Sequence, residues 1–320
     1  MAVTTRVFRE GRMEPEPLPP ERISDVLAEP GALAWVDIEG TPTEEEVGVL
    51  AREFGFHELA LEDCVHAHQR PKVEQYEGWF FLVAYGFSGS DGSTPHEVAA
   101  FVAHDYLVTV RKDPPYDLQG VLERWGAHPE LTAQGGGYLL YVLLDHIVDG
   151  YFDVLDAFED RSEDLEDRVL GQSSTEGQPD VFRLRKELAQ FRRRVAPLRD
   201  VLDVLQRRTV PVVTEALEPY YRDVYDHVLR AMDFADTLRD VLTSVLEASL
   251  AAVSNRLNEV MKQLTAWASI ILVPSLVAGI FGMNVLVPWQ GRMLGFWVTL
   301  GLMAGSAGVL YLLFKRRGWL

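Results

Sequence analysis

Acidic residues are missing from the C-terminal part of this 320-residue chain. All 48 Asp and Glu residues lie at or before Glu259, and residues 264–320 carry only four charges, all basic. Residues 1–263 therefore have a net charge of −22 and the last 57 residues one of +4, which together give −18. This separation predicts a strongly acidic, water-facing body joined to an apolar tail.

Several classes of protein are excluded by what else is scarce. Cys64 is the only cysteine, so a secreted domain held together by disulfides is excluded. An acidic body offers no basic face to nucleic acid, and we expect no such partner. The first twenty residues contain no apolar run of the signal-peptide kind, so we expect the body to stay in the cytosol. We find neither a phosphate-binding GxxxxGK[ST] motif nor a nucleophile–base pair, and we expect neither an enzyme nor an organic cofactor.

The apolar tail contains two long stretches without any charge. One, of 29 residues, lies between Lys262 and Arg292, and the other, of 22 residues, lies between Arg292 and Lys315. A hydrocarbon core about 30 Å thick needs roughly 20 apolar helical residues, so each stretch is long enough to span it. Buried helices of a soluble core rarely run this long without an outer charge. We therefore predict transmembrane helices over 264–284 and 294–314, an outer loop over 285–293 and a basic cytosolic tail over 315–320.

The basic residues that flank these stretches predict their orientation. Two of them, Arg256 and Lys262, precede the first span, and only Arg292 lies in the connection. Because basic residues accumulate on the cytoplasmic side, both termini should be cytoplasmic in a multi-pass protein of the cell inner (plasma) membrane. The inner mouth would then carry Lys315, Arg316 and Arg317.

The first predicted span carries a seam of mostly small or hydroxyl-bearing residues. Two helices from one chain cannot enclose a polar path, so a pore would need several copies around an axis. Spacings of three and four are those along which parallel helices pack around such an axis, and small side chains permit close approach. The alternative is that these small residues merely pack against the second span. The seam consists of Met261, Thr265, Ala268, Leu272, Ser275, Gly279 and Gly282.

The acidic body reads as an α+β arrangement in two parts. Residues 1–130 should form a cytosolic α/β domain with strands near 34–38, 79–87, 98–103 and 106–110, and with a helix over 44–54 capped by Thr43. Residues 131–263 should form a helical hairpin and a stalk. A helix of about 65 residues from near 219 to 283 would be roughly 95 Å long and would continue into the first span, where Pro274 should kink or loosen it.

The helical hairpin should have one acidic and one basic arm. The basic arm follows the loop at 171–180 and contains Arg192, Arg193 and Arg194 among others. Two interpretations are compatible: the two arms have complementary, solvated faces, or uncompensated acids face a central cavity and concentrate cations there. The acidic stripe consists of Asp145, Asp149, Asp153, Asp156, Asp160, Glu163 and Asp167.

Five motifs, in this order along the chain, give a family resemblance. They are Glu62–Glu74 (EDCVHAHQRPKVE), Tyr220–His227 (YYRDVYDH), Ser254–Lys262 (SNRLNEVMK), Phe281–Asn284 (FGMN) and Phe314–Leu320 (FKRRGWL). Together they resemble the CorA family of magnesium and cobalt transport proteins, from about residue 33 to the end. The resemblance implies a homopentameric funnel in membrane lipid. It also implies influx of Mg²⁺, and of Co²⁺ or Ni²⁺ as further divalent cations, driven by the membrane potential.

The resemblance also assigns roles to residues of the first span. Gly282, Met283 and Asn284 would form the outer selectivity ring, and Asn258 an inner polar ring. Mg²⁺ gives up its water reluctantly, so amide oxygens that hydrogen-bond a hydrated ion would bind it weakly enough to conduct. The implied pore lining is Asn258, Met261, Leu264, Thr265, Ala268, Leu272, Ser275 and Gly279, with Leu264 and Leu272 as apolar constrictions.

Regulation by intracellular Mg²⁺ is a further implication of the resemblance. Asp223 would be one ligand, and a partner acid is expected just after the strand that ends near Phe87. The sequence there is Ser88-Gly89-Ser90-Asp91-Gly92, so Asp91 is our candidate for the second ligand. The predicted metal ligands are therefore Asn284, Asp223 and Asp91. Beyond Asn284 the outer loop has no acid, which removes capture by an external carboxylate ring.

Two alternative functions remain open at this point. A Zn²⁺ transporter of the same architecture would share every feature above, although Met283 favours magnesium. A membrane-anchored sensor or scaffold without flux would have no need of Asn284. Two other candidates are weak: His66 and His68 would point to different faces of a helix, and Cys64 is expected to be a buried structural thiol.

Overall fold

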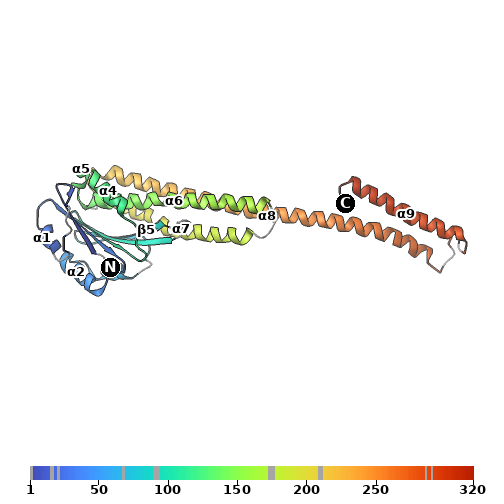
Figure 1. The fold of residues 1–320 in the computed structure, drawn as a ribbon, viewed down its shortest axis with the longest axis horizontal. Coiled ribbons are helices and arrows are strands. Elements are labelled where there is room, and N and C mark those ends of the chain that lie inside the picture. The colour runs from blue at the N-terminus through green and yellow to red at the C-terminus, as the bar shows by residue number, and fades with distance from the viewer. Residues whose placement is uncertain are drawn as a thin grey trace. The chain divides into compact units, whose positions relative to one another are not determined.

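The computed structural model of the chain describes residues 3–14, 18–19, 22–66, 69–88, 94–171, 177–207, 212–284, 287–289 and 291–320 (Figure 1). They form two compact units. The first consists of Met1–Asp167 and Gln178–Thr243, and the second of Arg168–Gly177 and Ser244–Leu320. Asp91, the predicted second metal ligand, and His68 lie outside the described residues.

A mixed sheet of seven strands lies at the centre of the first unit. Its strand order is β2-β1-β3-β7-β6-β5-β4, in which only the β3–β7 pair is parallel. Its strands β3, β5, β6 and β7 are buried along almost their whole length, as expected for a sheet covered on both faces. The strands are β1 (Val3–Arg9), β2 (Arg12–Met13), β3 (Ala32–Glu39), β4 (Lys72–Gln75), β5 (Phe80–Ser88), β6 (Thr94–Val102) and β7 (Tyr106–Arg111).

The four predicted strands correspond to β3, β5, β6 and β7. The strands β1, β2 and β4 were not predicted. Their sequences mix charged and apolar residues, as in Lys72–Gln75 (KVEQ), so they lack the apolar runs that mark a buried strand. They are strands because each pairs with a neighbouring strand: β1 with β3, β2 with β1, and β4 with β5.

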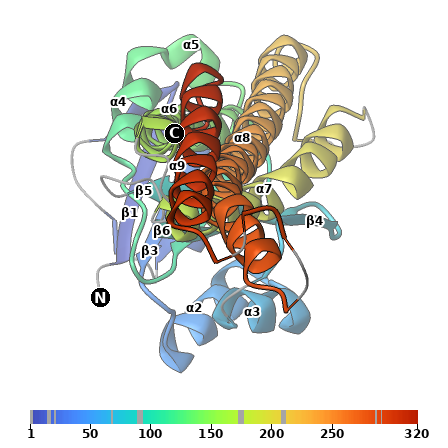
Figure 2. The same cartoon turned by 90° about the vertical axis from the view of Figure 1, so that its right-hand side faces the viewer.

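Short helices cover the sheet (Figure 2). On one face, Phe54 of α2 and Phe56 after it pack against Tyr106 and Phe101. On the other face, Trp125 of α4 packs edge-on against Trp35, with ring centroids 4.9 Å apart. The short helices are α1 (Ile23–Leu27), α2 (Glu44–Phe54), α3 (Glu58–Val65), α4 (Gln119–Ala127) and α5 (Pro129–Thr132).

The predicted cap of α2 is present in the structure. The Thr43 hydroxyl accepts a hydrogen bond from the Glu46 backbone N–H, and the Glu46 carboxylate accepts one from the Thr43 N–H at 2.7 Å. This reciprocal arrangement is a capping box. The helix ends at Gly55, which adopts a left-handed conformation with φ 68° that glycine tolerates without strain.

Three long helices complete the first unit: α6 (Gly136–Gly171), α7 (Gln178–Gln206) and the first half of α8 (Glu218–Phe281). The Tyr221 hydroxyl on α8 donates to the Gly137 carbonyl of α6 at 2.8 Å. A Cβ on Gly137 would lie 2.1 Å from the Val212 carbonyl oxygen, so only glycine permits this approach. On α7, Phe191 packs between Tyr151 of α6 and Phe87 of the sheet.

The second unit contains the rest of α8 and the whole of α9 (Met293–Arg316). The predicted long helix is confirmed, because α8 runs for 64 residues and continues through Pro274. Both helices are long and apolar enough to cross a membrane. Their most apolar 18-residue windows are only 6% and 0% buried within the chain, which separates them from the core helices of a soluble protein.

Candidate functional site

The residues of the predicted pore seam are exposed in the single chain. Leu264 and Leu272 have exposed fractions of 60% and 68%, although both are large apolar side chains. In water such exposure would be costly, so this face requires a partner, either lipid or further copies of the chain. The whole predicted lining is exposed: Asn258, Met261, Leu264, Thr265, Ala268, Leu272, Ser275 and Gly279.

The face of α8 that is partly covered within the chain is not the one that carries the seam. Ala266 is buried, and Ile270, Val273, Val277 and Phe281 are half-buried, at spacings of three and four. At about 100° per residue this stripe lies on the side opposite Ala268, Ser275 and Gly279. The small residues of the seam are therefore not used to pack α9 within one chain, which argues against the second interpretation of the sequence pattern.

Hydroxyl groups along α8 are tied back to its own backbone. Thr265 Oγ1 donates to the Met261 carbonyl at 2.7 Å, and Ser275 Oγ donates to the Ile271 carbonyl at 2.8 Å. Each hydroxyl thereby donates its hydrogen bond within the helix, and its oxygen lone pairs can still accept a hydrogen bond from an outside donor. Water held by a cation is such a donor, so these positions suit a hydrated ion.

Gly282, Met283 and Asn284 directly follow the C-terminal end of α8. The Gly282 N–H donates to the Ala278 carbonyl at 2.9 Å and the Met283 N–H to the Ile280 carbonyl at 3.3 Å, so the chain leaves the helix in a tight turn. All three residues are exposed. The Asn284 side chain thus lies at the end of the seam, beyond the last helical turn.

At the other end of the seam, Asn258 lines a cavity of about 540 Å³. The C-terminal Trp319 closes the cavity on one side, and its ring stacks on Phe314 of α9, with centroids 5.3 Å apart. The rest of the lining is polar, with Asn255, Glu259, Lys262 and Thr265 beside the apolar Met261.

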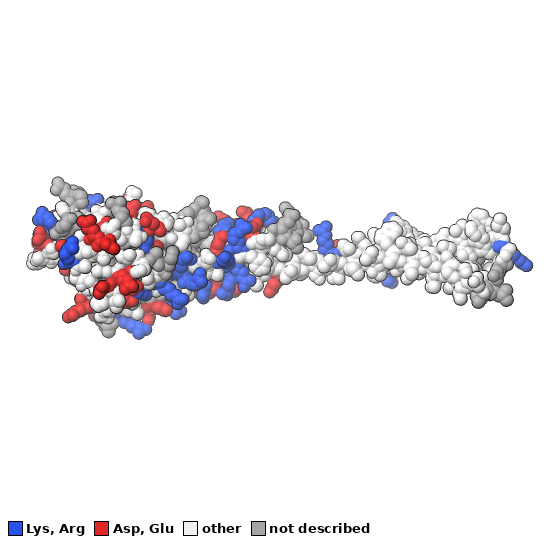
Figure 3. Space-filling view, turned by 90° about the horizontal axis from the view of Figure 1, so that it is seen from below, with Lys and Arg blue, Asp and Glu red and all other residues white. Residues whose placement is uncertain are grey.

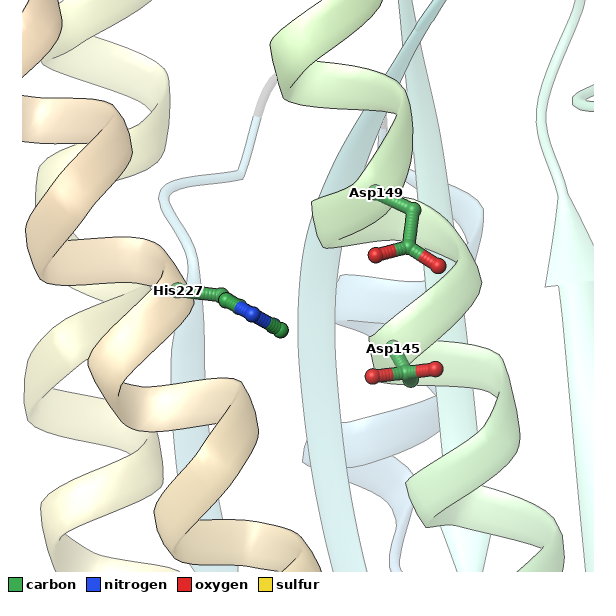
Figure 4. A group of neighbouring side chains, drawn as sticks. All are labelled: Asp145, Asp149 and His227. Atoms are coloured by element: carbon green, nitrogen blue, oxygen red, sulfur yellow. The ribbon is translucent and has the colours of Figure 1, made fainter.

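A second constellation lies in the first unit, where α6 and α8 face each other. The side chains of Asp145 and Asp149 on α6 point toward the imidazole of His227 on α8 (Figure 4). One ligand atom from each residue lies within 4.8 Å of the others. His227 Nδ1 is buried and, among the described residues, has no hydrogen-bond partner. Two carboxylates and an unpartnered imidazole nitrogen are donors that a divalent cation can use.

Arg124 compensates part of the negative charge at this cluster. Its guanidinium lies 2.6 Å from the buried Asp145 carboxylate and 3.9 Å from that of Asp149. Burial, followed by repulsion from Asp145, raises the pKa of Asp149 above its ordinary value, and Arg124 opposes this shift. A raised carboxylate pKa indicates a site where added positive charge is favourable.

Asp223, the predicted regulatory ligand, lies one helical turn before His227 on α8. Its Oδ2 is 3.8 Å from His227 Nδ1, and its side chain is 62% exposed. Asp223 therefore adjoins the cluster and remains open to solvent or to another chain.

The place expected for its partner acid is Ser88, at the end of β5. The Ser88 hydroxyl lies 2.6 Å from His96 Nε2, and His96 Nδ1 lies 2.6 Å from the Pro114 carbonyl oxygen. Because a carbonyl only accepts, Nδ1 donates to Pro114 and Nε2 accepts from Ser88. Ser88 is thus engaged with the sheet and offers no carboxylate.

The acidic stripe of α6 is exposed except at Asp145. One ion pair between the two arms of the hairpin has its charges reversed from those expected. Arg161, on the predicted acidic arm α6, pairs with Glu187 on the predicted basic arm α7 at 2.6 Å. On the basic arm, Arg192 pairs with Asp236 of α8 at 2.9 Å. Figure 3 shows acidic and basic side chains gathered on the first unit and almost none on the second. The stripe is therefore available to attract cations.

Two weaker candidates have structural roles. Cys64 is buried, and burial raises the pKa of its thiol to about 12, so it is not a thiolate at neutral pH. His66 follows the last residue of α3, and its Nδ1 lies 2.9 Å from the Glu62 carbonyl. Neither residue belongs to the cluster of Asp145, Asp149 and His227.

The Asp145–Asp149–His227 cluster was not predicted as a site. The sequence analysis included both acids in the α6 stripe and His227 in the YYRDVYDH motif. Helical spacing placed the acids on one face, but it could not bring α8 opposite them. A signal was present, since an acidic pair and a histidine both lie on long amphipathic helices, but only tertiary packing joins them.

Comparisons with known proteins match the chain over most of its length. A sequence model of the family described as CorA-like Mg²⁺ transporter protein matches residues 30–316. The cobalt/magnesium transport protein CorA of Thermotoga maritima is 33% identical over 291 residues, covering 89% of this chain and 83% of that protein. The putative metal ion transporter YfjQ of Bacillus subtilis is 32% identical, with 89% of each chain covered.

The fold is also similar to solved structures. The complete structure of the CorA magnesium transporter from Methanocaldococcus jannaschii superimposes with a TM-score of 0.80 at 25% identity. The superposition covers 100% of this chain and 99% of the other. The sheet, the long helix and the two C-terminal apolar helices are therefore those of a full-length protein of that kind.

Proposed function

Because the chain belongs to the family of CorA-like Mg²⁺ transporter proteins, we propose that it carries Mg²⁺ into the cell through a pore lined by α8. The observation that carries this proposal is the exposed seam of α8, which faces away from the covered stripe and ends at Asn284. A homopentamer, as the resemblance implies, would bring five such seams around one axis. Both termini would lie in the cytoplasm and the two apolar helices in the plasma membrane.

Transport in this pore needs no covalent chemistry. A ring of Asn284 amide oxygens would accept hydrogen bonds from the water around Mg²⁺, and five copies of Asn258 would do the same at the inner end. Weak, repeated binding of this kind allows the ion to leave as well as enter. A doubly charged ion gains about 4.6 kcal/mol per 100 mV of inside-negative potential, at about 2.3 kcal/mol per charge, so passive influx is sufficient.

Closure would depend on the apolar part of the seam and on the cytosolic acids. Leu264 and Leu272 are the two leucines of the predicted lining, and rings of these apolar side chains would dewet a narrow pore. The cluster of Asp145, Asp149 and His227, with Asp223 beside it, would bind an intracellular divalent cation. A cation bound there would hold α6 and α8 together and so stabilise the closed arrangement. The imidazole nitrogen makes the cluster suitable for Co²⁺ or Ni²⁺ as well as Mg²⁺.

Ion flux into liposomes that contain the purified protein tests the proposal. We expect Mg²⁺ uptake that increases with an inside-negative potential and is lost in Asn284→Ala. Gln263→Ala is the matched control, since it removes an exposed amide from α8 outside both the seam and the cavity at Asn258, and it should retain uptake. Uptake of Zn²⁺ alone would instead support the zinc transporter. Absence of flux for Mg²⁺, Co²⁺ and Zn²⁺ would leave the membrane-anchored sensor or scaffold.

A further inference from the structure

A cavity of about 340 Å³ lies between the end of α8 and the start of α9. Its volume is at the lower end of the range of about 300–1,000 Å³ that is usual for ligand pockets. Its walls combine small residues, which leave the space open, with aromatic ones. The small residues are Ala278, Gly282, Gly291 and Gly295, and the aromatic ones are Phe281, Trp289 and Phe296.

Arg292 is the one charged residue that lines this cavity. It is also the only charged residue between Lys262 and Lys315, and no acidic residue follows Glu259. Among the described residues it makes no ion pair, and it is exposed. The cavity thus has a guanidinium group that this part of the chain does not neutralise, and its electrostatic complement is an anion.

The backbone next to Arg292 has an unusual conformation at Trp289 and a close approach at Gly295. Trp289 adopts a φ of 63°, which is rare for a bulky side chain, and its carbonyl accepts the Arg292 N–H at 3.1 Å. A Cβ on Gly295 would lie 2.7 Å from that same carbonyl oxygen, so glycine is required for α9 to start this close. Strain of this kind persists only where surrounding contacts hold it, and here it fixes an indole and a guanidinium at one cavity.

We infer that this cavity binds the headgroup of an anionic phospholipid, with the phosphate on Arg292. The aromatic wall suits the glycerol and the first carbons of an acyl chain, since Trp has an apolar ring with a polar N–H and is enriched at the headgroup level, and Phe adds apolar contact. Phe296 and Trp297, whose side chains are 60% and 64% exposed, continue the apolar surface along the start of α9.

The inference rests on the proposed function in one respect, because it places this loop at a membrane surface. It also explains how a cation pathway tolerates a basic outer loop. In a ring of copies, each Arg292 would repel an arriving Mg²⁺, whereas a bound phosphate would cancel that charge. The lipid would thereby supply the negative charge that the loop itself does not contain.

Photo-crosslinking of lipid to the full-length protein tests this site. The protein is reconstituted in phosphatidylcholine with a trace of phosphatidylglycerol or of phosphatidylcholine that carries a diazirine near the headgroup. Labelled peptides are then identified by mass spectrometry. We expect labelling of the segment 287–299 to be about fivefold stronger with phosphatidylglycerol, which corresponds to ~1 kcal/mol for one basic residue near a charged surface.

The variants separate the arginine from general charge effects. Arg292→Gln should reduce phosphatidylglycerol labelling of this segment to the phosphatidylcholine level, and Arg292→Lys should retain most of it. Arg317→Gln, at the other end of α9, is the matched control and should leave labelling of 287–299 unchanged. Equal labelling by the two lipids in the wild-type protein would overturn the inference, and that comparison needs no variant to fold.

A competition experiment distinguishes a lipid from a free anion. Inorganic phosphate at millimolar concentration should leave phosphatidylglycerol labelling of the segment intact, because the acyl contacts would be missing. Complete competition by phosphate would overturn the assignment to a lipid. Labelling is measured without any ion gradient, so its result does not depend on whether the protein conducts Mg²⁺.

Discussion

At the scale of single residues, the two candidate sites use different chemistry for different tasks. Asn284 offers a neutral amide at the end of the seam, which suits brief contact with a hydrated ion. Asp145, Asp149 and His227 offer charged or strongly donating groups that suit longer occupancy by a cation. The difference follows from the charge separation in the sequence, because the acids lie in the body and none follows Glu259.

Asp223→Ala should weaken closure by intracellular Mg²⁺. The carboxylate adjoins His227 and is exposed, so its removal lowers the negative potential at the cluster without disturbing the core. Mg²⁺ should protect the wild-type protein from limited proteolysis at a lower concentration than it protects the variant. Asp226→Ala, which lies on the same helix outside the cluster, is the control. Equal protection of wild type and Asp223→Ala would contradict the prediction.

Cation binding at the cluster should weaken as the pH falls. A cation needs the ionised form of Asp149, and burial beside Asp145 raises the pKa of Asp149, so protons compete at a higher pH than at an exposed carboxylate. Calorimetric titration of the detergent-solubilised protein with Co²⁺ should give a higher affinity at pH 7.5 than at pH 5.5. Asp149→Asn should bind more weakly and with a smaller dependence on pH. An affinity of Asp149→Asn for Co²⁺ at pH 7.5 equal to that of the wild type would refute a role for Asp149.

At the scale of elements, α8 contributes to both units, because it supplies His227 to the cluster and the seam to the pore that we propose. Its sequence predicted its extent closely, since no proline lies between Pro219 and Pro274 to interrupt it. The N-terminus of α6 was harder to predict. Three consecutive glycines at 135–137 look like a flexible linker, yet in the structure they allow close backbone contacts.

Gly137→Ala should destabilise the first unit. The added Cβ would lie 2.1 Å from the Val212 carbonyl oxygen, and forcing α6 away would also strain the Tyr221 hydrogen bond to Gly137. Overpacking of this kind costs about 1–3 kcal/mol. Gly126→Ala is the matched control, because its Cβ would meet open space on α4. Thermal unfolding should show a lower Tm for Gly137→Ala only, and an unchanged Tm would show that α6 can shift freely.

At the scale of the whole molecule, charge is divided between the two units. The exposed stripe on α6 keeps most of its acids without a described partner on α7, whereas the basic arm pairs partly with α8. In the proposed orientation, the acidic body would raise the local concentration of cations near the inner pore mouth. It would not capture them from outside, where the loop would carry Arg292.

Neutralising the stripe should therefore lower conduction at low ionic strength and have little effect at high ionic strength. The triple variant Asp156→Asn, Asp160→Asn, Glu163→Gln should conduct less outward Mg²⁺ current than the wild type at about 10 mM salt, where the Debye length is about 30 Å. At about 150 mM salt the two proteins should differ little, because the Debye length falls to about 8 Å. A deficit that persists unchanged at high salt would indicate a structural rather than an electrostatic role.

The sequence by itself determined the local features: the Thr43 capping box, the four apolar strands, the long helix, the two apolar spans and the spacing of the seam. These depend on neighbours within a few residues, so periodicity and composition suffice to predict them. The strands β1, β2 and β4 depend on the tertiary structure, because pairing partners rather than their own residues make them strands. The same holds for the meeting of Asp145 and Asp149 with His227. Those residues are brought together by the packing of α6 on α8, which depends on contacts between residues far apart in the chain.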